Sequence, residues 1–513
     1  ALSCWRRSRR SATSRRSRPR SPARGWGAGP APATRASEFS RRTEPTDADR
    51  KKLVLVVIDG LTPEVLRRGF DEGRLPALAS LAEAGWSGRG TSVFPSLTPV
   101  CLTSIATGAF PDVHAIPHLV WYHRGEGRVV EYGSSFSAMR AVGARRSIRD
   151  TVFAMSGEHV AKSATTVFEA LEDGGLEPAA INFTCYRGRT RHPIRLPVLA
   201  RRNRWYEAVY GPRHFFFFNV FESERTGAGL AVRSRLEGSI DDYAGAIGRW
   251  LVTRDGFDFL VFYLPDYDYA SHISGPEGSL AALERSDGAV ARLLEAAGGT
   301  DAFLERYAVV ACSDHGQTPV ERLARLHDSF PGGERGVLAL ASNRAGMVYR
   351  LDGCRLAARD LAERLDDAPA ADVVLFLEDG AAVARRDGAE LRFALAGEEW
   401  RLEGEASVLD FDRYPNGLER AWRALHCANA GEVLVSAAEG WEFADLGGRH
   451  HLGGGSHGSL GAGDSIVPLV AAGFDEPPYP PDPGITDIAP LALAHFGLPA
   501  PAGMRRSREA ARA

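Results

Sequence analysis

Three short apolar runs in this chain each lead into an aspartate. Residues 53–58 (LVLVVI) precede Asp59, residues 259–264 (FLVFYL) precede Asp266 and Asp268, and residues 308–312 (AVVAC) precede Asp314. Uninterrupted apolar runs of this length are typical of strands buried on both faces of a parallel sheet. Because ligands of open α/β sheets bind at the carboxyl ends of the strands, these aspartates are the first candidates for a functional site.

Helical patterns alternate with these runs between residues 51 and 335. The spacing of apolar residues predicts a further short strand at 179–183 and helices within 63–84, 166–172, 239–250 and 279–297. Alternation of strands and helices indicates a doubly wound parallel sheet. We therefore expect an α/β fold with a mostly parallel sheet flanked by helices, whose first part spans residues 53–335.

The pattern changes between residues 336 and 450. Short strands are predicted at 347–351, 373–377 and 390–395, with a helix at 354–365 and turns at 379–380 and 386–388. This segment is predicted to be a small α+β insertion that forms a cap beside the site.

Residues 451–513 are predicted to return to the main domain. They begin with a glycine-rich loop (GGGSHGSLGAGD) and a strand at 465–472. A last helix follows a proline-rich linker; Thr486 or Asp487 is its expected cap and Gly497 its end.

The first 52 residues differ in composition from the rest. They hold 15 Lys+Arg and 4 Asp+Glu, whereas the remaining residues hold 47 Lys+Arg and 61 Asp+Glu. A segment with so few large apolar side chains cannot bury a core, so residues 1–52 are predicted to be a disordered basic tail. The tail is either a transit-like or anion-binding arm or a solvated extension. The acidic remainder carries no nucleic-acid-binding signature.

No run approaches the ~18 apolar residues of a membrane-spanning helix, and no secretory signal is recognisable. Six cysteines in 513 residues are too few to suggest a disulfide framework. These features favour a cytoplasmic protein. Nothing in the sequence indicates an oligomeric state.

Histidines accompany the aspartates. His272 follows Asp268 by four residues, His315 is adjacent to Asp314, and His457 lies in the glycine-rich loop. A carboxylate and an imidazole four residues apart can face the same ion, and carboxylates gathered at one edge repel unless a cation lies between them. Three Asp and three His exceed the ligands that one metal usually takes. The set therefore suggests two ions, which are typical of phosphoryl transfer.

Each candidate ligand has an alternative interpretation. An aspartate such as Asp59, at the end of a strand, is on its own more often a turn or helix-cap residue than a metal ligand. Asp266 competes with Asp268, but the spacing to His272 favours Asp268. His450 and His451 compete with His457 and are interpreted as surface loop residues.

Thr98, in the segment FPSLTP, is the candidate nucleophile. It occupies the expected N-cap of a helix that starts at Pro99 and ends at Gly108. The partial positive charge of a helix N-terminus favours an alkoxide or phosphate there, although a hydroxyl needs a metal to activate it. The alternative is that Thr98 only caps the helix.

Taken together, these segments resemble the alkaline phosphatase superfamily and, within it, the type I phosphodiesterase/nucleotide pyrophosphatase family. The resemblance extends from about residue 51 to about residue 501 and is weakest across 336–450. The motifs that carry it are, in chain order, Asp59 after the first strand, FPS-x-T ending at Thr98, Thr107-Gly108…Pro111…His114-Ala115-Ile116 with alanine in place of a glycine, Asp268-x-x-x-His272 followed by Gly275-Pro276, Ser313-Asp314-His315-Gly316, and His457-Gly458.

The resemblance implies an alkaline-phosphatase-like fold and two zinc ions, with Mn²⁺ or another divalent ion as an alternative. It implies that Asp268, His272 and His457 hold one ion. The other ion is then held by Asp59, Asp314, His315 and the oxygen of Thr98. Thr98 is the implied nucleophile, which forms a phospho-threonine, and the implied substrate is a small-molecule phosphate ester.

The chain departs from the family pattern beside the nucleophile. The family usually has F-P-N-H after the threonine, where this chain has PVCL, and the asparagine that helps to bind phosphate falls at Leu119. His118 is a candidate substitute. Arg187 and His192, in the stretch CYRGRTRH, are further candidate substrate contacts, with a solvated basic loop as the alternative.

The sequence therefore predicts an enzyme, a two-metal hydrolase of phosphodiester or phosphoanhydride bonds. A phosphomonoesterase or phosphonate hydrolase on the same scaffold is the alternative, and a mutase or phosphotransferase also stays open. A sulfatase is disfavoured because no C/S-x-P-x-R segment surrounds Thr98. A non-catalytic metal-binding module is less favoured still, since all six ligands and the hydroxyl are present.

Overall fold

The structure is a computed structural model that describes residues 50–193, 207–218, 221–224, 239–330 and 334–504. These residues belong to one compact unit that begins at Arg50. The predicted basic tail lies outside the described residues except for its last three positions. Within the described part, none of the helices has the length and apolar character needed to cross a bilayer, and the five cysteines are free thiols.

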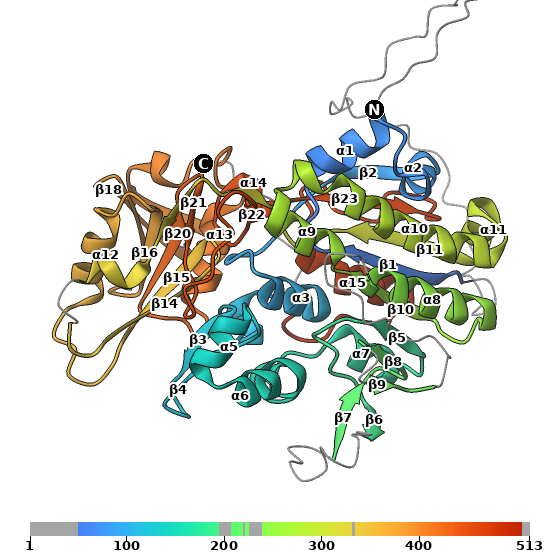
Figure 1. Ribbon diagram of the computed structural model, residues 1–513, viewed down its shortest axis with the longest axis horizontal. Helices are drawn as coiled ribbons and strands as arrows, with labels where there is room; N and C mark the ends of the chain where they lie inside the picture. The colour runs from blue at the N-terminus through green and yellow to red at the C-terminus, as the bar shows by residue number, and fades with distance from the viewer. Residues whose placement is uncertain (1–49, 194–206, 219–220, 225–238, 331–333, 505–513) are drawn as a thin grey trace, which may run out of the picture. The chain divides into compact units, whose positions relative to one another are not determined.

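The main sheet has eight strands and is mostly parallel, as predicted (Figure 1). Strands β11, β1, β10, β5 and β8 run parallel, and β23, β2 and β9 pair antiparallel with their neighbours. Their order across the sheet is β2 (Gly85–Thr91), β23 (Ile466–Ala472), β11 (Tyr307–Cys312), β1 (Lys52–Ile58), β10 (Phe259–Leu264), β5 (Pro178–Ile181), β8 (His214–Phe217) and β9 (Phe221–Glu222).

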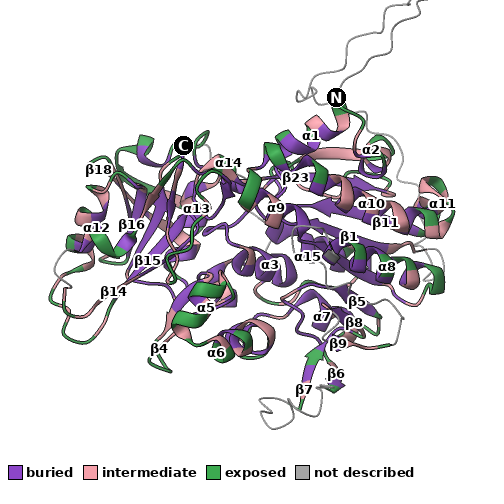
Figure 2. Cartoon of the chain, in the orientation of Figure 1, coloured by how far each residue is buried: buried purple, intermediate pink, exposed green. Residues whose placement is uncertain are grey.

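Helices cover both faces of this sheet. Alternate residues of β1 belong to different apolar cores: Leu53, Leu55 and Val57 face one, and Val54, Val56 and Ile58 face the other. The first core includes α3 (Thr98–Thr107), α7 (Val167–Asp173) and α15 (Ile488–His495), and the second includes α1 (Pro63–Asp71), α2 (Pro76–Glu83), α8 (Ser239–Arg254), α10 (Leu280–Ala297) and α11 (Thr300–Arg306). Burial on both faces explains why β1 is apolar at every position after Lys52, and Figure 2 shows the central strands buried throughout.

A second, seven-stranded antiparallel sheet lies within residues 337–437. Its order is β14 (Val337–Ser342), β15 (Ala345–Arg350), β20 (Val433–Ala437), β16 (Ala371–Glu378), β17 (Ala381–Arg386), β18 (Ala389–Ala396) and β19 (Glu399–Gly404). Helix α12 (Ala358–Asp366) packs on one face, and α13 (Gly417–Leu425) packs on the other, in a core continuous with that of the main sheet. The three strands predicted here correspond to β15, β16 and β18. The domain boundaries at 336 and 450 stay predictions.

Further elements complete the described part of the chain. Residues 63–84, expected to be one helical region, form two helices separated by Gly73, whose φ is 67°. The remaining elements are α4 (Pro111–His114), β3 (Val120–His123), β4 (Arg128–Glu131), α5 (Phe136–Val142), α6 (Ala144–Arg149), a π-helix (Asp150–His159), β6 (Thr190–Pro193), β7 (Ala208–Gly211), α9 (Asp266–Ser274), β12 (Thr318–Pro319), β13 (Arg322–Ala324), β21 (Trp441–Phe443), β22 (Gly455–Ser456), α14 (Ala462–Ser465) and 3₁₀ turns at Glu277–Ser279, Leu326–Ser329, Ala406–Leu409 and Ile485–Asp487.

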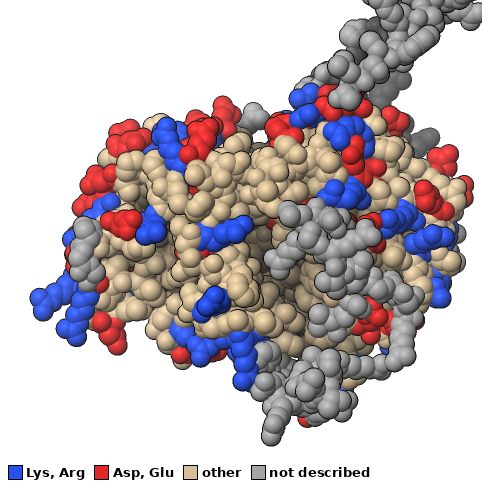
Figure 3. Space-filling model, in the orientation of Figure 1, with Lys and Arg blue, Asp and Glu red and all other residues tan. Residues whose placement is uncertain are grey.

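The surface carries both signs of charge. On the face drawn in Figure 3, basic and acidic side chains are interspersed around the rim, and the centre is mostly uncharged. A nucleic-acid-binding surface needs basic residues clustered on one face, and this face has no such separation of charge among the described residues.

Candidate active site

Three buried carboxylates meet at one edge of the main sheet. Asp59 directly follows β1, and its backbone N–H donates to Leu264 O at the end of β10 at 3.0 Å. Asp268 lies in the first turn of α9, just after β10, and Asp314 follows β11 by two residues. The three residues are at most 5% exposed. Since the parallel strands end in register, the fold gathers three negative charges in one place, as the apolar runs predicted.

Asp266, the competitor of Asp268, faces away from this cluster. Its carboxylate accepts a hydrogen bond from the backbone N–H of Asp241 at 3.0 Å, at the start of α8. Asp268 instead lies 3.3 Å from Nε2 of His272, one helical turn further along α9. The four-residue spacing therefore selected the aspartate that shares its helix face with a histidine.

Three histidines share one arrangement. Each imidazole donates from Nδ1 to a backbone carbonyl, so that Nε2 keeps its lone pair and faces the carboxylates. The acceptors are Gly455 O for His272 (2.8 Å), Gly316 O for His315 (3.0 Å) and Ser96 O for His457 (2.8 Å). The rings of His315 and His457 stack with centroids 3.6 Å apart. Backbone anchoring of one ring nitrogen is the usual support of a histidine that binds metal through the other.

The short pairing of β12 with β22 brings His457 to this edge. Thr318 pairs with Ser456 only three residues after His315. The glycine-rich loop passes close to its neighbours, and a Cβ on Gly454 would lie only 2.2 Å from the backbone carbonyl oxygen of His272. This close approach requires glycine and fixes the position of the loop that carries His457.

Burial sets the protonation of the cluster. It raises the pKa of Asp59 well above the usual value, and the charges of Asp314 and Asp268 raise it further. Burial likewise raises the pKa of Asp314. Burial also favours a raised pKa for Asp268, but His272, together with His457 and His315, outweighs this and holds the pKa of Asp268 below its usual range. A cation between the three carboxylates would relieve the repulsion among them.

The donor atoms lie close enough to share metal ions. The ligand atoms of Asp59, Asp314 and His315 lie within 4.8 Å of one another, and so do those of Asp268, His315 and His457. Oδ1 of Asp59 and Oδ2 of Asp314 are buried without a hydrogen-bond partner in the described structure, which is costly for a carboxylate that no cation neutralises. Mixed imidazole and carboxylate donors suit zinc and similar divalent ions.

The residues present therefore fit divalent metal. His315 belongs to both sets of ligand atoms, whereas His272 joins the cluster through Asp268. The structure brings all six predicted ligands together, and their division between two ions stays a prediction.

Thr98 faces this cluster. Leu97 is the N-cap of α3 and Thr98 is its first helical residue, so the expected cap position is displaced by one. The Thr98 hydroxyl lies 3.1 Å from Nε2 of His315. The side chain thus points at the candidate ligands, and no side chain makes a capping hydrogen bond at the start of this helix. The interpretation of Thr98 as only a cap is therefore not supported.

Two neighbours that the sequence analysis missed hold the carboxylates. The hydroxyl of Tyr263 donates to Oδ2 of Asp59, and Nε2 of Gln317 donates to Oδ1 of Asp268. Oε1 of Gln317 in turn accepts from Ser271 Oγ at 2.5 Å. Gln317 follows His315 by two residues and could have been found by its place in that loop. Tyr263 lies inside an apolar strand, and its residue type does not distinguish it from the core residues around it.

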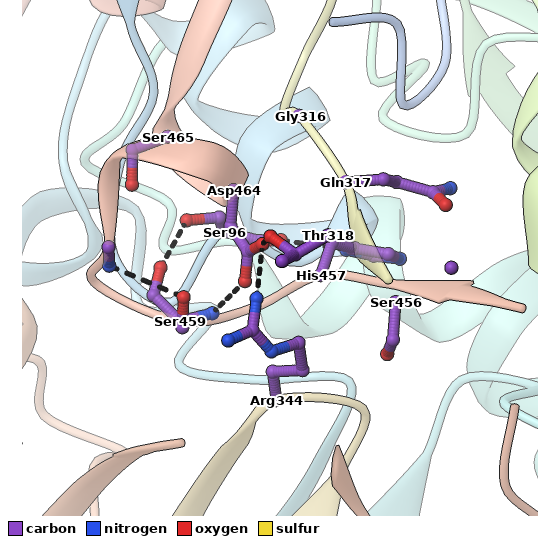
Figure 4. Close-up of polar contacts among 12 residues, drawn as sticks. Ser96, Gly316, Gln317, Thr318, Arg344, Ser456, His457, Ser459, Asp464 and Ser465 are labelled. Carbon is purple, nitrogen blue, oxygen red and sulfur yellow. Dashed lines mark hydrogen bonds and ion pairs between the residues drawn. The ribbon is translucent and has the colours of Figure 1, made fainter. Parts of the chain in front are cut away.

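A buried ion pair supports the loop of His457. Arg344 Nη1 donates to Oδ1 of Asp464 at 2.7 Å, and these side chains are 4% and 0% exposed. Asp464 also accepts from the hydroxyl of Thr318 and from the backbone N–H of Ser459 at 2.8 Å. Figure 4 shows Arg344 reaching from below to Asp464, between Thr318 and Ser459. The pair links the second sheet to the loop that carries His457.

His451 is not the surface loop residue that we expected. Its ring stacks on His272 with centroids 4.0 Å apart, and its Nδ1 lies 2.6 Å from Oε1 of Glu442. His450, by contrast, is exposed. His451 therefore packs behind a candidate ligand.

The candidate substrate contacts lie within the protein. Arg187 pairs with Glu169 at 3.1 Å and donates to backbone carbonyls at residues 160, 161 and 164. His192 donates to Pro212 O at 2.8 Å. Both side chains are buried, so they form neither a solvated loop nor free donors, and we do not assign them to the substrate.

His118 is fully buried, and its Nδ1 accepts from the N–H of Val120 at 3.1 Å. Burial lowers the pKa of His118 to about 4, so its imidazole is neutral near pH 7. A substrate contact by His118 stays a prediction. The adjacent Leu119 packs against the apolar core and cannot supply the missing amide.

Three solved structures are similar to this chain in fold. Phosphonoacetate hydrolase from Sinorhizobium meliloti in complex with phosphonoformate superimposes with a TM-score of 0.58 at 18% identity, covering 87% of this chain and 96% of that one. Human ectonucleotide pyrophosphatase/phosphodiesterase 5 gives 0.55 at 15% identity, covering 88% and 96%. An inactive variant of the murine protein, in complex with AMP, gives 0.52 at 15%, with the same coverage. A search of the curated proteins found no match.

The mostly parallel sheet flanked by helices defines an α/β fold of the alkaline phosphatase type, as these similar structures show. A model of the type I phosphodiesterase / nucleotide pyrophosphatase family matches residues 53–460. The chain belongs to this family, and this membership supports phosphoester hydrolysis as the activity of the protein.

Proposed function

We propose that this protein hydrolyses phosphodiester or phosphoanhydride bonds of a small-molecule phosphate ester, using two divalent metal ions, most simply zinc, and Thr98 as nucleophile. The observation that carries the proposal is the common orientation of His272, His315 and His457. Each presents Nε2 to a buried carboxylate, and the Thr98 hydroxyl joins them at His315.

Asp59, Asp314 and His315, with the oxygen of Thr98, are proposed to hold one ion, and Asp268, His272 and His457 the other. Bound divalent ions would lower the pKa of the attacking hydroxyl and neutralise charge on the phosphoryl group. The backbone N–H groups at the start of α3 add a partial positive charge beside Thr98.

The reaction then proceeds in two displacements at phosphorus. Oγ1 of Thr98 loses its proton to solvent and bonds to phosphorus as the bond to the leaving oxygen breaks, which gives a phospho-threonine, and the leaving oxygen takes up a proton from solvent. Water next attacks phosphorus, the bond to Thr98 breaks, and Oγ1 regains a proton. Tyr263 and Gln317 hold Asp59 and Asp268 through both steps.

A phosphomonoesterase or phosphonate hydrolase is the second candidate. It is favoured by Leu119, whose apolar side chain replaces the amide expected for a nucleotide phosphate and packs into the core. A phosphomonoester or an unesterified phosphonate also lacks the second ester group that the site of a diesterase has to accommodate.

The experiment measures metal content and turnover on the same purified protein, with bis(p-nitrophenyl) phosphate, p-nitrophenyl phosphate and phosphonoacetate as substrates. We expect about two divalent ions per chain, the highest kcat/KM with the diester, and loss of turnover on chelation that zinc restores. Faster turnover of the monoester or phosphonate would establish the second candidate instead. Full activity in protein freed of metal would rule out the proposal.

A further inference from the structure

The turn between β14 and β15 carries an asparagine into the metal cluster. Ser342 pairs with Ala345 across a two-residue turn made of Asn343 and Arg344. Asn343 has φ = 57°, the left-handed conformation that asparagine tolerates better than most residues. This side chain belongs to the second sheet, and no motif of the main sheet points to it.

The turn is held from several directions. Its Asn343 carbonyl accepts from the N–H of Phe443 at 2.8 Å, and the N–H of Arg344 donates to His457 O at 2.9 Å. The guanidinium of Arg344 is fixed by Asp464. Asn343 is therefore placed at His457 by backbone contacts and a buried ion pair, and its 6% exposure leaves it little freedom.

The amide nitrogen of Asn343 points at the atom that His457 offers to metal. Nδ2 lies 3.0 Å from Nε2 of His457. Because Nδ1 of His457 donates to Ser96 O, Nε2 is an acceptor, so the amide group beside it must be the donor NH₂. The other end of the side chain, Oδ1, accepts from Ser342 Oγ at 3.1 Å.

The single lone pair on Nε2 of His457 cannot bind a cation and accept a hydrogen bond from Asn343 at the same time. If Nε2 of His457 binds a cation, Nδ2 of Asn343 loses its acceptor while it remains buried at the cluster. A buried N–H without an acceptor is destabilising, so the amide needs another oxygen at the same place. The substrate of the proposed reaction brings oxygens that carry negative charge. The chain also lacks the amide that the family pattern has at position 119.

We propose that Nδ2 of Asn343 donates a hydrogen bond to a non-bridging oxygen of the substrate's phosphoryl or phosphonyl group. The inference rests on the proposed function, because it takes His457 as a metal ligand and a phosphorus oxyanion as the bound group. It assigns to the second sheet a direct part in substrate recognition. Asn343 touches substrate in this role and is distinct from residues that only position His457.

The test uses N343G and N343D, since glycine and aspartate both accept a left-handed backbone. Calorimetry on the metal-loaded full-length protein measures the Kd of inorganic phosphate, and metal analysis of the same sample measures occupancy. A hydrogen bond to a charged group contributes about 1.5–3 kcal/mol, so N343G should weaken phosphate binding about 10- to 100-fold with metal content unchanged. N343D should weaken it further, by repulsion. The matched control is N416G, at another left-handed asparagine (φ 50°), which should bind phosphate as the wild type does.

Three outcomes would overturn the inference. The first is an unchanged phosphate Kd in N343G. The second is a loss of bound metal in N343G, which would make Asn343 a support of His457 alone. The third is a metal-loaded wild type that binds no phosphate. Failure of the proposed function is recognised separately, as absence of turnover by a wild type whose phosphate affinity still depends on Asn343.

Discussion

The hydroxyl of Thr98 and the imidazole of His315 face each other, with Oγ1 3.1 Å from Nε2. They come from the first turn of α3 and the loop after β11, 217 residues apart in sequence. The contact places the candidate nucleophile on the same ring nitrogen that faces Asp59 and Asp314 at 3.3 and 3.4 Å. This geometry ties the chemistry of Thr98 to the metal ligands and leads to the first prediction.

Replacement of Thr98 by alanine should remove the nucleophile while leaving the six ligands in place. We expect kcat/KM for the preferred substrate to fall at least about 10³-fold, with metal content close to that of the wild type. T98S keeps a hydroxyl and should retain measurable turnover. The measurement is steady-state kinetics with metal analysis of each sample.

Thr103 provides the control for Thr98. It lies on the same helix, and its hydroxyl donates to Pro99 O at 2.6 Å, away from the cluster. T103A should change kcat/KM by only a few-fold. Turnover by T98A at the level of T103A would mean that Thr98 has no catalytic part.

The buried hydroxyl of Tyr263 should control metal affinity. It donates to Asp59 and thereby lowers the pKa of a carboxylate that burial and its neighbours raise. Y263F should weaken metal binding about 10- to 100-fold, the range for groups that support a ligand. Competition with a chromogenic chelator measures this change, and the loss should be greatest at low pH, where Asp59 is protonated more readily.

Tyr267 is a matched control, because it is also fully buried but donates to Pro276 O at 3.3 Å. Y267F should leave metal affinity unchanged. Equal losses in both variants would show that the packing of the tyrosine ring, and not its bond to Asp59, determines the affinity.

The parts of the site that could be predicted from the sequence pattern are those at the ends of strands. Asp59, Asp268 and Asp314 could be predicted because each follows an apolar run, and parallel strands end at one edge. His272 could be predicted because a four-residue spacing places it on the face of Asp268. These inferences depend only on local periodicity and on the type of sheet.

The remaining parts depend on contacts distant in sequence. Asn343 and Arg344 reach the site from a hairpin turn more than 110 residues before Asp464 and His457, and their residue types are ordinary for a turn. Tyr263 lies within an apolar run and His451 within a polar loop, so the sequence does not distinguish either residue as part of the site. Only the folded structure reveals that Asn343, Tyr263 and His451 contact candidate ligands. It also reveals that Arg344 supports the loop of His457 through Asp464.

The second sheet was underestimated for a related reason. Strand β19 is exposed along most of its length, and β17 is rich in alanine and arginine, so neither carries the alternation of β-branched and polar residues that marks a strand. Their pairing with β18 supplies what their own sequences lack.

The ion pair between Arg344 and Asp464 should be important for stability. Both side chains are buried, and removal of one partner leaves an uncompensated charge, which costs about 3–5 kcal/mol. R344M should therefore lower the free energy of unfolding by an amount of this order, measured in urea. A double-mutant cycle with D464N should give a large coupling energy.

The exposed pair of Arg67 and Asp71 is the control for this prediction. Its side chains are 53% and 66% exposed, and exposed pairs contribute little. R67M should leave the unfolding midpoint nearly unchanged. A loss in R344M no larger than that in R67M would contradict a structural role for the buried pair.

The buried imidazole of His159 should make the protein less stable in acid. His159 ends the π-helix, and its Nδ1 lies 2.8 Å from the hydroxyl of Tyr132. Burial lowers the pKa of His159 from 6.5 to about 4. Above pH 6.5 the ring is neutral in both the folded and the unfolded states. Between pH 6.5 and 4 the unfolded chain binds a proton that the folded protein does not, so stability falls as the pH falls.

At pH 5 this difference amounts to about 2 kcal/mol. H159Q removes the titrating group, so its free energy of unfolding, relative to the wild type, should rise by about this amount between pH 7.5 and pH 5. Urea unfolding of metal-free protein at both pH values measures the change without interference from metal release. If the difference between H159Q and the wild type is the same at pH 7.5 and pH 5, the buried imidazole is not a source of acid sensitivity.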